Sequence, residues 1–503
     1  MTVTPYRSVR DRLIRPTLGE LWTFLAVALP VLAALIATLP TVDLAYQLRA
    51  GAEILDGQGI PTSDTWTFTA AGLPWLDQQW GAQVVLAATY QVAGWTGLAI
   101  FRAALVGLVA GLILLAVRLR APEMRSRTAA LLGLAAFVVM APALALRPQL
   151  LGMVLFAATL AILAGRRARP RAVWLVPVLA VLWANVHGSF ILAPVLVGLA
   201  WLEDTTERST RGRATFLAAL ATGAATLVTP FGFGAWGYAV GITANRQVTA
   251  QVSEWQPPTI TDVPGMIFWG SVVLVGGAAL LLIRRGRGAP DPWAAVLALI
   301  AFGTLGAMTG RGLAWWPGVA VVTLAGLVAQ TGPIGIPAPR TTRGSKLNAL
   351  VAGVLVVAGI ALLPAWRPVD PDLGVPRGLL GQAPPGITAA LRELATSADR
   401  VWNPQVWGSW LEFAVPKPMY AFDSRIEVIP AEVWSDASVV AAAGSGWDQI
   451  LERGGATIVI TDDPETSPLA AALATVPLGP AASAWHRVYA DSEGSIWVRS
   501  DRR

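Results

Sequence analysis

Five carboxylates gather in one stretch of an otherwise apolar chain. The stretch runs from residue 41 to about residue 80, directly after the first hydrophobic segment, where a purely structural membrane protein would usually have a short turn. Its acidic residues are Asp43, Glu53, Asp56, Asp64 and Asp77. Because a positioned carboxylate can take a proton from a hydroxyl group as a general base, we interpret this stretch as half of an active site.

A second set of polar residues stands at the ends of later apolar segments. Pro148 disfavours helical geometry in the residue before it, so that residue ends one segment and starts the next. Residue 311 lies between two glycines, which allow close backbone approach. Ionisable groups at membrane depth that converge on one face are typical of a site, and we expect this set to face the same side as Asp43. The set is Arg147, His187, Glu254 and Arg311.

The composition excludes several classes of protein. Of the 503 residues, 54% are hydrophobic and 14% are charged, whereas a soluble domain has about 25% charged residues. The net charge of +6 comes from arginine clusters between apolar segments, which indicates membrane topology and not nucleic-acid binding. The chain has no cysteine and two histidines. A zinc site built on cysteine is therefore excluded, and we expect no metal and no cofactor.

About eleven apolar runs have lengths near those that cross a bilayer. The first exceeds the core of a signal peptide, and we predict that it is a retained span. The runs at 172–184 and 189–202 are short and could form one broken or re-entrant pair. A further piece, 81–94, is expected to form a helix near the interface. The runs are 18–39, 97–117, 128–146, 149–165, 172–184, 189–202, 214–229, 265–283, 292–309, 312–329 and 347–365.

Basic residues up to the last run fall almost entirely in alternate connections. The rule that cytoplasmic loops carry the excess of Lys and Arg places this set, with the N-terminus, in the cytoplasm. The acidic stretch and everything after the last run then face outward. The basic residues on that outer side need another reason to be there, and they are Arg49, Arg147, Arg246 and Arg311.

The chain becomes polar after the last run. We predict a cytoplasmic N-terminus over 1–17, a transmembrane domain over 18–365 that includes a large first outer loop at 41–96, a linker over 366–385, and an extracytoplasmic α/β domain over 386–503. In that domain helices are expected at about 387–398, in WGSWLEF, at about 436–453 and at 467–475. Strands are expected in RVWN, PMYAFDSR and ATIVITDD, followed by a terminal hairpin. This alternation predicts a mostly parallel sheet.

Several motifs resemble a known family. They are DLAYQLRAG, IPTSDTWTFTAAGLPWLDQQW, RPQL, WANVHGSF, TPFG, EWQPP and, in the tail, AFDSRIEVIP. Together they resemble bacterial polytopic glycosyltransferases of the GT-C superfamily, whose plan is similar to that of dolichyl-phosphate-mannose-dependent mannosyltransferases. The resemblance implies a mainly α, GT-C-like bundle in a bacterial plasma membrane. It also implies catalysis by an acidic residue just past the first span, and Asp43 is the position that matches.

The same resemblance implies the partners of the chain. The donor would be a sugar linked to polyprenyl phosphate, and the acceptor an envelope glycan, a lipid or a protein. Membrane lipids would surround the chain, and no nucleic acid would bind. The chain departs from the group because Asp43 has no acidic neighbour, Gln47 replaces a histidine, and Gln78 and Gln79 replace a His-Glu pair.

These departures leave two alternatives open. Since they remove titratable groups, a non-catalytic envelope assembly protein is one alternative. A lipid or glycan transporter is the other, although it would place charges within spans and show paired discontinuous helices in two halves.

Sugar transfer from a lipid phosphate needs a base for the acceptor hydroxyl and cationic groups for the phosphate. Asp43 is the predicted base, and it could also cap the helix that begins there. Gln47 and Gly51 follow at i+4 and i+8 on the same helix face. We expect them to form a polar, uncrowded stripe beneath the sugar.

Asp64 and Asp77 are weaker candidates for substrate binding. Asp64 is a second acid, an acceptor ligand or a residue that stabilises a turn. Asp77 lies near Trp75 and Trp80, an arrangement that suits a sugar ring but also a membrane interface.

Arg147 and Arg311 are predicted to bind phosphate through paired hydrogen bonds, unless they pair structurally with an acid such as Glu254. His187 either binds phosphate or sugar, or packs internally. Asp423 and Arg425 of the tail motif are expected to form an internal salt bridge or turn.

Overall fold

The structure is a computed structural model, and it describes residues 8, 10, 14–244, 253–286, 292–331, 343–463, 466–475 and 485–500. Arg246 lies outside these residues. The chain divides into two compact units. Unit 1 comprises Met1–Ala37 and Ala99–Trp366, and unit 2 comprises Thr38–Leu98 and Arg367–Arg503.

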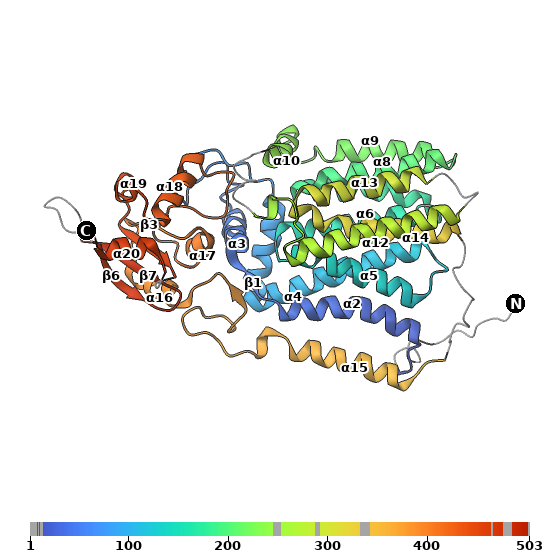
Figure 1. Cartoon of the computed structure of the whole chain (residues 1–503), viewed down its shortest axis with the longest axis horizontal. Helices are drawn as coiled ribbons and strands as arrows, with labels where there is room; N and C mark the ends of the chain where they lie inside the picture. Colours follow the sequence, from blue (N-terminus) through green and yellow to red (C-terminus); the bar gives the residue numbers. More distant parts are fainter. Residues whose placement is uncertain are drawn as a thin grey trace. The chain divides into compact units, whose positions relative to one another are not determined.

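Unit 1 is a bundle of helices. Each of the predicted apolar runs contains a helix in the described part of the chain, and Figure 1 shows many of them running side by side. The helices are α2 (Leu18–Ile36), the second part of α4 (Trp80–Arg120), α5 (Ser126–Met140), α6 (Pro148–Gly165), α7 (Val176–Ala184), α8 (Leu192–Thr206), α9 (Gly212–Ala225), α12 (Val263–Arg285), α13 (Trp293–Met308), α14 (Trp316–Thr331) and α15 (Lys346–Ala361).

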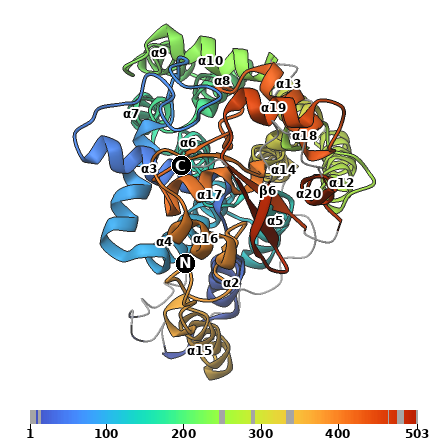
Figure 2. The same cartoon turned by 90° about the vertical axis from the view of Figure 1, so that its left-hand side faces the viewer.

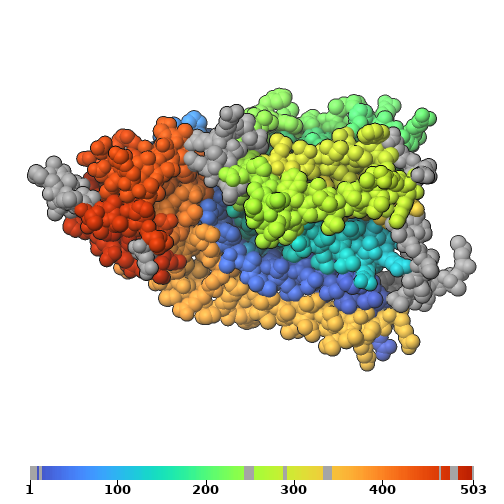
Figure 3. All heavy atoms as spheres, in the orientation of Figure 1, coloured from blue at the N-terminus to red at the C-terminus, as the bar shows by residue number. Residues whose placement is uncertain are grey.

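Length and composition make many of these helices suitable for a membrane. Within the described residues, 6 helices are long and apolar enough to cross one, and shorter apolar helices accompany them. Figure 3 shows α12 in yellow-green and α15 in amber on the surface of unit 1. Both expose large apolar side chains, among them Val273, Leu274, Val354 and Val357. A helix that is apolar on all sides is stable at such a surface when lipid replaces water.

Short signals in the sequence set the helix ends. Thr17 and Glu20 form a capping box that starts α2. Gly94 has φ 59° and ψ −157°, a conformation open almost only to glycine, and it divides α4 into two helical parts. The first part is the helix predicted at 81–94. The runs at 172–184 and 189–202 form separate helices, and the second extends as a candidate span over Gly188–Thr206.

Unit 2 contains a five-stranded mixed sheet with the order β4-β3-β5-β7-β6. The pairs β3–β4 and β3–β5 are parallel, whereas β5–β7 and β6–β7 are antiparallel. The predicted hairpin is therefore confirmed, but the mostly parallel sheet is wrong, because the second strand of the hairpin pairs with β5 and a hairpin is antiparallel by construction. The strands are β3 (Arg400–Trp402), β4 (Met419–Tyr420), β5 (Ile458–Asp462), β6 (Trp485–Ala490) and β7 (Gly494–Arg499).

Five helices accompany this sheet, and Figure 2 shows them in orange and red around its strands. The helix predicted over 436–453 is two helices, because Gly446 adopts a left-handed φ of 83° between them. The helices are α16 (Pro385–Leu394), α17 (Gln405–Ala414), α18 (Ala431–Ala441), α19 (Trp447–Gly454) and α20 (Pro468–Thr475).

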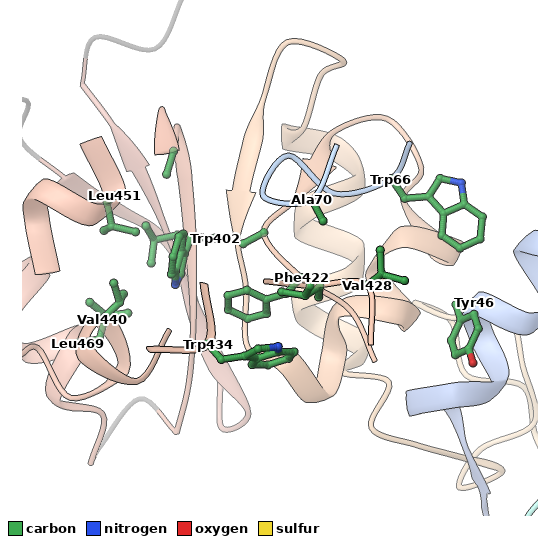
Figure 4. Packing of buried hydrophobic residues seen from close by; sticks show 14 of the residues in the cluster. Tyr46, Trp66, Ala70, Trp402, Phe422, Val428, Trp434, Val440, Leu451 and Leu469 are labelled. Carbon is green, nitrogen blue, oxygen red and sulfur yellow. The ribbon is translucent and has the colours of Figure 1, made fainter. Parts of the chain in front are cut away.

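The first outer loop folds with the tail. The strand just before the loop, β1 (Leu39–Pro40), pairs in parallel with β2 (Leu380–Gly381), and the N–H of Phe68 donates to the Tyr420 carbonyl at 2.9 Å. Figure 4 shows Tyr46 and Trp66 of the loop in one apolar cluster with residues of the tail. These units divide the chain differently from the predicted domains, in which the loop belongs to the bundle and 366–385 is a linker. Burying large aromatic side chains favours this arrangement.

Candidate functional site

Three of the predicted residues meet in unit 1. Arg147 Nη1 donates to Glu254 Oε1 at 2.7 Å and to Oε2 at 2.8 Å. Arg311 Nε lies 3.4 Å from Glu254 Oε2. The side chains of Arg147, Arg311 and Glu254 are 23%, 33% and 40% exposed. Glu254 thus pairs with both arginines, as the structural alternative predicted, while solvent still reaches all three groups.

The backbone at Arg147 is set by its neighbour. Arg147 has φ −138° and ψ 165° and is the N-cap of α6, with Pro148 as the first helical residue. This is the extended geometry that a following proline favours. The Arg147 side chain therefore extends from a defined backbone position at the N-terminus of α6.

Arg311 lies in the short helix η5 (Gly310–Ala314). A Cβ at Gly312 would collide with the carbonyl of Leu305, so only glycine allows this approach to α13. The N–H of Gly310 donates to the Gln256 carbonyl at 2.9 Å. The Arg311 guanidinium also lies 4.6 Å from the ring centroid of Trp255, in a cation–π contact. These contacts bring η4 (Ser253–Trp255) and η5 together.

The charges of these three residues make the cluster a candidate anion site. Burial tends to raise the pKa of Glu254, but Arg147 and Arg311 outweigh it, and the pKa is lowered. Glu254 is therefore ionised at neutral pH. Two guanidiniums and one carboxylate leave a net charge of about +1 at the cluster, since arginine stays protonated in proteins.

His187 lies half-buried in the turn between α7 and η3 (Gly188–Ile191). Its Nδ1 accepts the backbone N–H of Ser189 at 3.1 Å, so in the neutral ring Nε2 carries the proton. Burial and the charge of Arg311 lower the pKa of His187 to about 3. The ring lies 6.4 Å from that of Trp315. His187 is thus a neutral hydrogen-bond donor that packs against an aromatic ring.

Asp43 lies in unit 2, half-buried in the first turn of α3 (Thr41–Leu55). The N-cap of this helix is Pro40, so the alternative that Asp43 caps it is wrong. A carboxylate in the first turn is still favoured by the helix dipole. Tail residues hold the backbone just before it, because Ser424 Oγ donates to the Val42 carbonyl at 2.6 Å and Thr41 Oγ1 donates to the Gly381 carbonyl at 2.8 Å.

The stripe expected beside Asp43 is not open. Gln47 is buried, and its Nε2 donates to Tyr46 Oη at 2.6 Å and to Gln79 Oε1 at 2.9 Å. A Cβ at Gly51 would collide with the carbonyl of Gln83 in α4. The close approach of the two helices covers this face, so the expectation of an uncrowded stripe is wrong.

Asp77 is buried beside a neutral partner. Gln83 Nε2 donates to Asp77 Oδ1 at 2.7 Å, and Oδ2 has no hydrogen-bond partner among the described residues. Burial raises the pKa of Asp77 to about 7. Trp75 is also buried and packs edge-on against Trp66 at 5.3 Å. The expectation that Trp75 offers a face to a sugar or to a membrane interface is therefore wrong.

Asp64 and Arg425 form a buried ion pair that joins the loop to the tail. Asp64 accepts hydrogen bonds from the backbone N–H and the hydroxyl of Thr67, and from Arg425 Nη2. The Arg425 guanidinium lies 4.2 Å from the ring centroid of Trp66. These contacts support the turn interpretation of Asp64. The expected Asp423–Arg425 salt bridge is present at 2.6 Å.

The sequence interpretation missed several residues of this region. Glu412 is fully buried, and neither of its carboxylate oxygens has a hydrogen-bond partner among the described residues. Burial, with the charge of Asp423, raises the pKa of Glu412 well above its ordinary value. Ser424, which holds the backbone before Asp43, lies inside the motif AFDSRIEVIP. That motif was the one signal available for it.

The structure also bears on metals. In the part of the chain that is described, no group of three or more His, Cys, Asp or Glu residues could hold a metal ion.

Comparison with known proteins identifies solved structures with a similar fold. No protein-family model and no curated protein sequence matches the chain. The oligosaccharyltransferase AglB from Archaeoglobus fulgidus, solved with an inhibitory peptide and a dolichol-phosphate, is similar with a TM-score of 0.59 and 13% identity over 89% of this chain and 70% of that one.

Two further structures are similar. ArnT from Cupriavidus metallidurans gives a TM-score of 0.51 and 14% identity over 95% of this chain and 97% of that one. The mycobacterial arabinofuranosyltransferase AftD gives 0.55 and 18% over 96% of this chain and 42% of that one. The chain therefore has the fold of GT-C membrane glycosyltransferases. The predicted fold class, a mainly helical membrane bundle with a C-terminal α/β domain, is confirmed.

Proposed function

We propose that the protein is an integral-membrane glycosyltransferase that transfers a sugar from a polyprenyl-phosphate-linked donor. The acceptor is an envelope glycan, lipid or protein on the outer face of a bacterial plasma membrane, and the N-terminus is cytoplasmic. The observation that carries the proposal is the solvent-accessible cluster of Arg147, Arg311 and Glu254 in a chain with this fold. The dolichol-phosphate in the similar AglB structure supports a lipid phosphate as the ligand class.

The proposed reaction is a direct displacement. Asp43 takes the proton of the acceptor hydroxyl, and the acceptor oxygen forms a bond to the anomeric carbon of the sugar. The bond from that carbon to the phosphate oxygen breaks, and its electron pair leaves with the phosphate. The phosphate changes from a diester with one negative charge to a monoester with nearly two. Arg147 and Arg311 stabilise the added charge, because fixed donors act most strongly where charge develops.

Other residues have supporting roles in this proposal. His187, a neutral donor at Nε2, contributes a hydrogen bond to the phosphate or sugar. Gln47 and Asp77 are substrate-binding candidates that act from buried positions in unit 2. Asp64 is left out because its carboxylate is engaged by Thr67 and Arg425.

The decisive experiment begins with a deletion strain. Loss of the enzyme makes its unused lipid-linked sugar accumulate, and mass spectrometry of the lipid extract identifies that donor. Membranes that contain Asp43→Asn are then expected to transfer the sugar about 10² to 10⁴ times more slowly than the parent, which is the usual contribution of a general base. Asp56→Asn is the matched control, because Asp56 is an exposed acid of the same loop. Equal rates for Asp43→Asn and the parent would show that Asp43 is not the base.

The same strain separates the alternative functions. Gln47 and Gln78 are buried neutral amides. Members of the glycosyltransferase group that the sequence resembles often have titratable residues at these positions, and this difference favours a non-catalytic assembly protein. Such a protein would bind the lipid-linked sugar without turnover, and Asp43→Asn would restore normal lipid levels. A transporter would instead move the lipid across vesicles that contain only this protein.

A further inference from the structure

The contact of Glu254 with two arginines bears on how a phosphate enters the cluster. We propose that Glu254 is an internal stand-in for the donor phosphate, a carboxylate that holds Arg147 and Arg311 until phosphate displaces it. This inference rests on the proposed function, because it concerns the same phosphate site. It makes Glu254 a residue that determines which ligands the site accepts and how readily they leave.

The geometry of the contact supports a shared binding position. One guanidinium nitrogen of Arg147 bonds both carboxylate oxygens of Glu254 at 2.7 and 2.8 Å, and Arg311 Nε approaches the second oxygen at 3.4 Å. Guanidinium N–H groups that bind carboxylate oxygens also bind phosphate oxygens. A phosphate on these donors would therefore occupy the place of the Glu254 carboxylate.

The charges favour exchange over joint binding for the phosphate that has lost its sugar. With Glu254 in place the cluster carries about +1, which a phosphodiester of charge −1 neutralises. After the donor bond breaks, the phosphate carries nearly −2, and Glu254 would then repel it. The two guanidiniums alone match that charge. The preference for exchange is thus weakest for the bound phosphodiester and grows as charge develops on the phosphate, and the return of the carboxylate would help to expel the product.

The surroundings allow this exchange. Glu254 is the most exposed of the three side chains and stands on the three-residue helix η4. The arginines have fixed supports, because Arg147 is the N-cap of α6 and Arg311 lies against Trp255. An ion pair with this exposure is weak compared with a buried one, so a phosphate can compete with it.

The test measures binding of farnesyl phosphate to the full-length protein in detergent by calorimetry, with farnesol as the uncharged probe. Glu254→Gln keeps the size and shape of the side chain and removes its charge. We expect it to bind farnesyl phosphate about tenfold more tightly than the parent, which corresponds to about 1.4 kcal/mol. Glu254→Asp is expected to bind like the parent or between the two. Farnesol affinity is expected to be equal in all variants.

Matched controls make each outcome informative. Glu432→Gln removes an exposed carboxylate in the tail and is expected to leave affinity unchanged. Thermal unfolding of Glu254→Gln shows whether the variant is folded, and in a folded variant the phosphate should raise the melting temperature more than in the parent. Tighter binding of the phosphate but not of farnesol supports the exchange.

Equal or weaker binding by folded Glu254→Gln would overturn the exchange. The phosphate site itself would still stand if Arg147→Met lost affinity for farnesyl phosphate. If the parent and Glu254→Gln both bound farnesyl phosphate no better than farnesol, the exchange and the phosphate site would fail together.

Discussion

The cluster of Arg425, Asp64 and Asp423 in unit 2 and the cluster of Arg147, Glu254 and Arg311 in unit 1 have the same chemistry and different exposure. In unit 2, Arg425 is 1% exposed and pairs with Asp64 and Asp423, whose side chains are fully buried. In unit 1, Arg147 and Glu254 are 23% and 40% exposed. The buried guanidinium also lies against Trp66 and Trp75. Its Nε and Nη2 atoms are engaged by Asp423 and Asp64, and burial closes the guanidinium to a ligand.

The difference teaches that solvent access, and not residue type, separates a structural arginine from a ligand-binding one. Removing one member of a buried pair leaves an uncompensated charge in an apolar surrounding, so exchange with a ligand is costly. A half-exposed pair contributes little to stability and can be replaced by a competing anion. Arg425 therefore joins the first loop to the tail, and Arg147 is the better candidate for phosphate.

The largest expected effect is on the stability of unit 2. Arg425→Met removes the charge that compensates Asp64 and Asp423, and we expect it to lower the free energy of unfolding by about 3–5 kcal/mol. Thermal unfolding and limited proteolysis of the loop in detergent measure this loss. Arg453→Met is the control, because Arg453 is 68% exposed and its pair with Asp436 should contribute under about 1 kcal/mol. Similar losses in the two variants would contradict the comparison.

A second prediction concerns Arg147, for which we expect a small change in stability and a large change in ligand affinity. Arg147→Met should change the free energy of unfolding by less than about 1 kcal/mol. It should weaken farnesyl phosphate binding by about ten- to a hundredfold, the usual size of a hydrogen bond to a charged group. Titration and thermal unfolding of the same preparation separate the two effects. A large loss of stability with unchanged affinity would make Arg147 structural.

The smallest expected effect is on the pH dependence of the melting temperature. Asp77 is a buried carboxyl of unit 2 whose direct partner is the amide of Gln83, and burial raises its pKa from 3.8 to about 7. The folded state therefore holds this proton more tightly than the unfolded state does. The stability that the carboxyl contributes is complete below about pH 4 and is lost as the pH rises through about 7.

Asp77→Asn removes this titration while keeping a hydrogen-bond acceptor for Gln83. We expect the melting temperature of the variant to fall less than that of the parent between pH 5 and pH 8.5, by a few degrees. Asp56→Asn, at an exposed position, should follow the parent. An equal fall in Asp77→Asn and the parent would show that Asp77 does not titrate in this range.

Much of the candidate site could be predicted because its signals are local. The proline after Arg147 and the glycines around Arg311 act on the adjacent backbone, and the structure has the expected conformations at both places. The pairing of these arginines with Glu254 was one of two alternatives, since charge alone does not distinguish a protein carboxylate from a phosphate. The open stripe at Gln47 was wrong, because helix periodicity shows which residues share a face but not what covers it.

The sequence by itself determined the helices of the bundle, because apolar length and the positions of Pro and Gly act through neighbouring residues. It also determined which residue types were available for chemistry. Only the tertiary structure decided their partners and their burial. Asp64 meets Arg425 across 361 positions of the chain, and Arg147 meets Glu254 across 107. No local pattern encodes contacts between residues so far apart in the sequence. The exposure that separates the buried ion pair from the accessible one is therefore decided only by the packing within each unit.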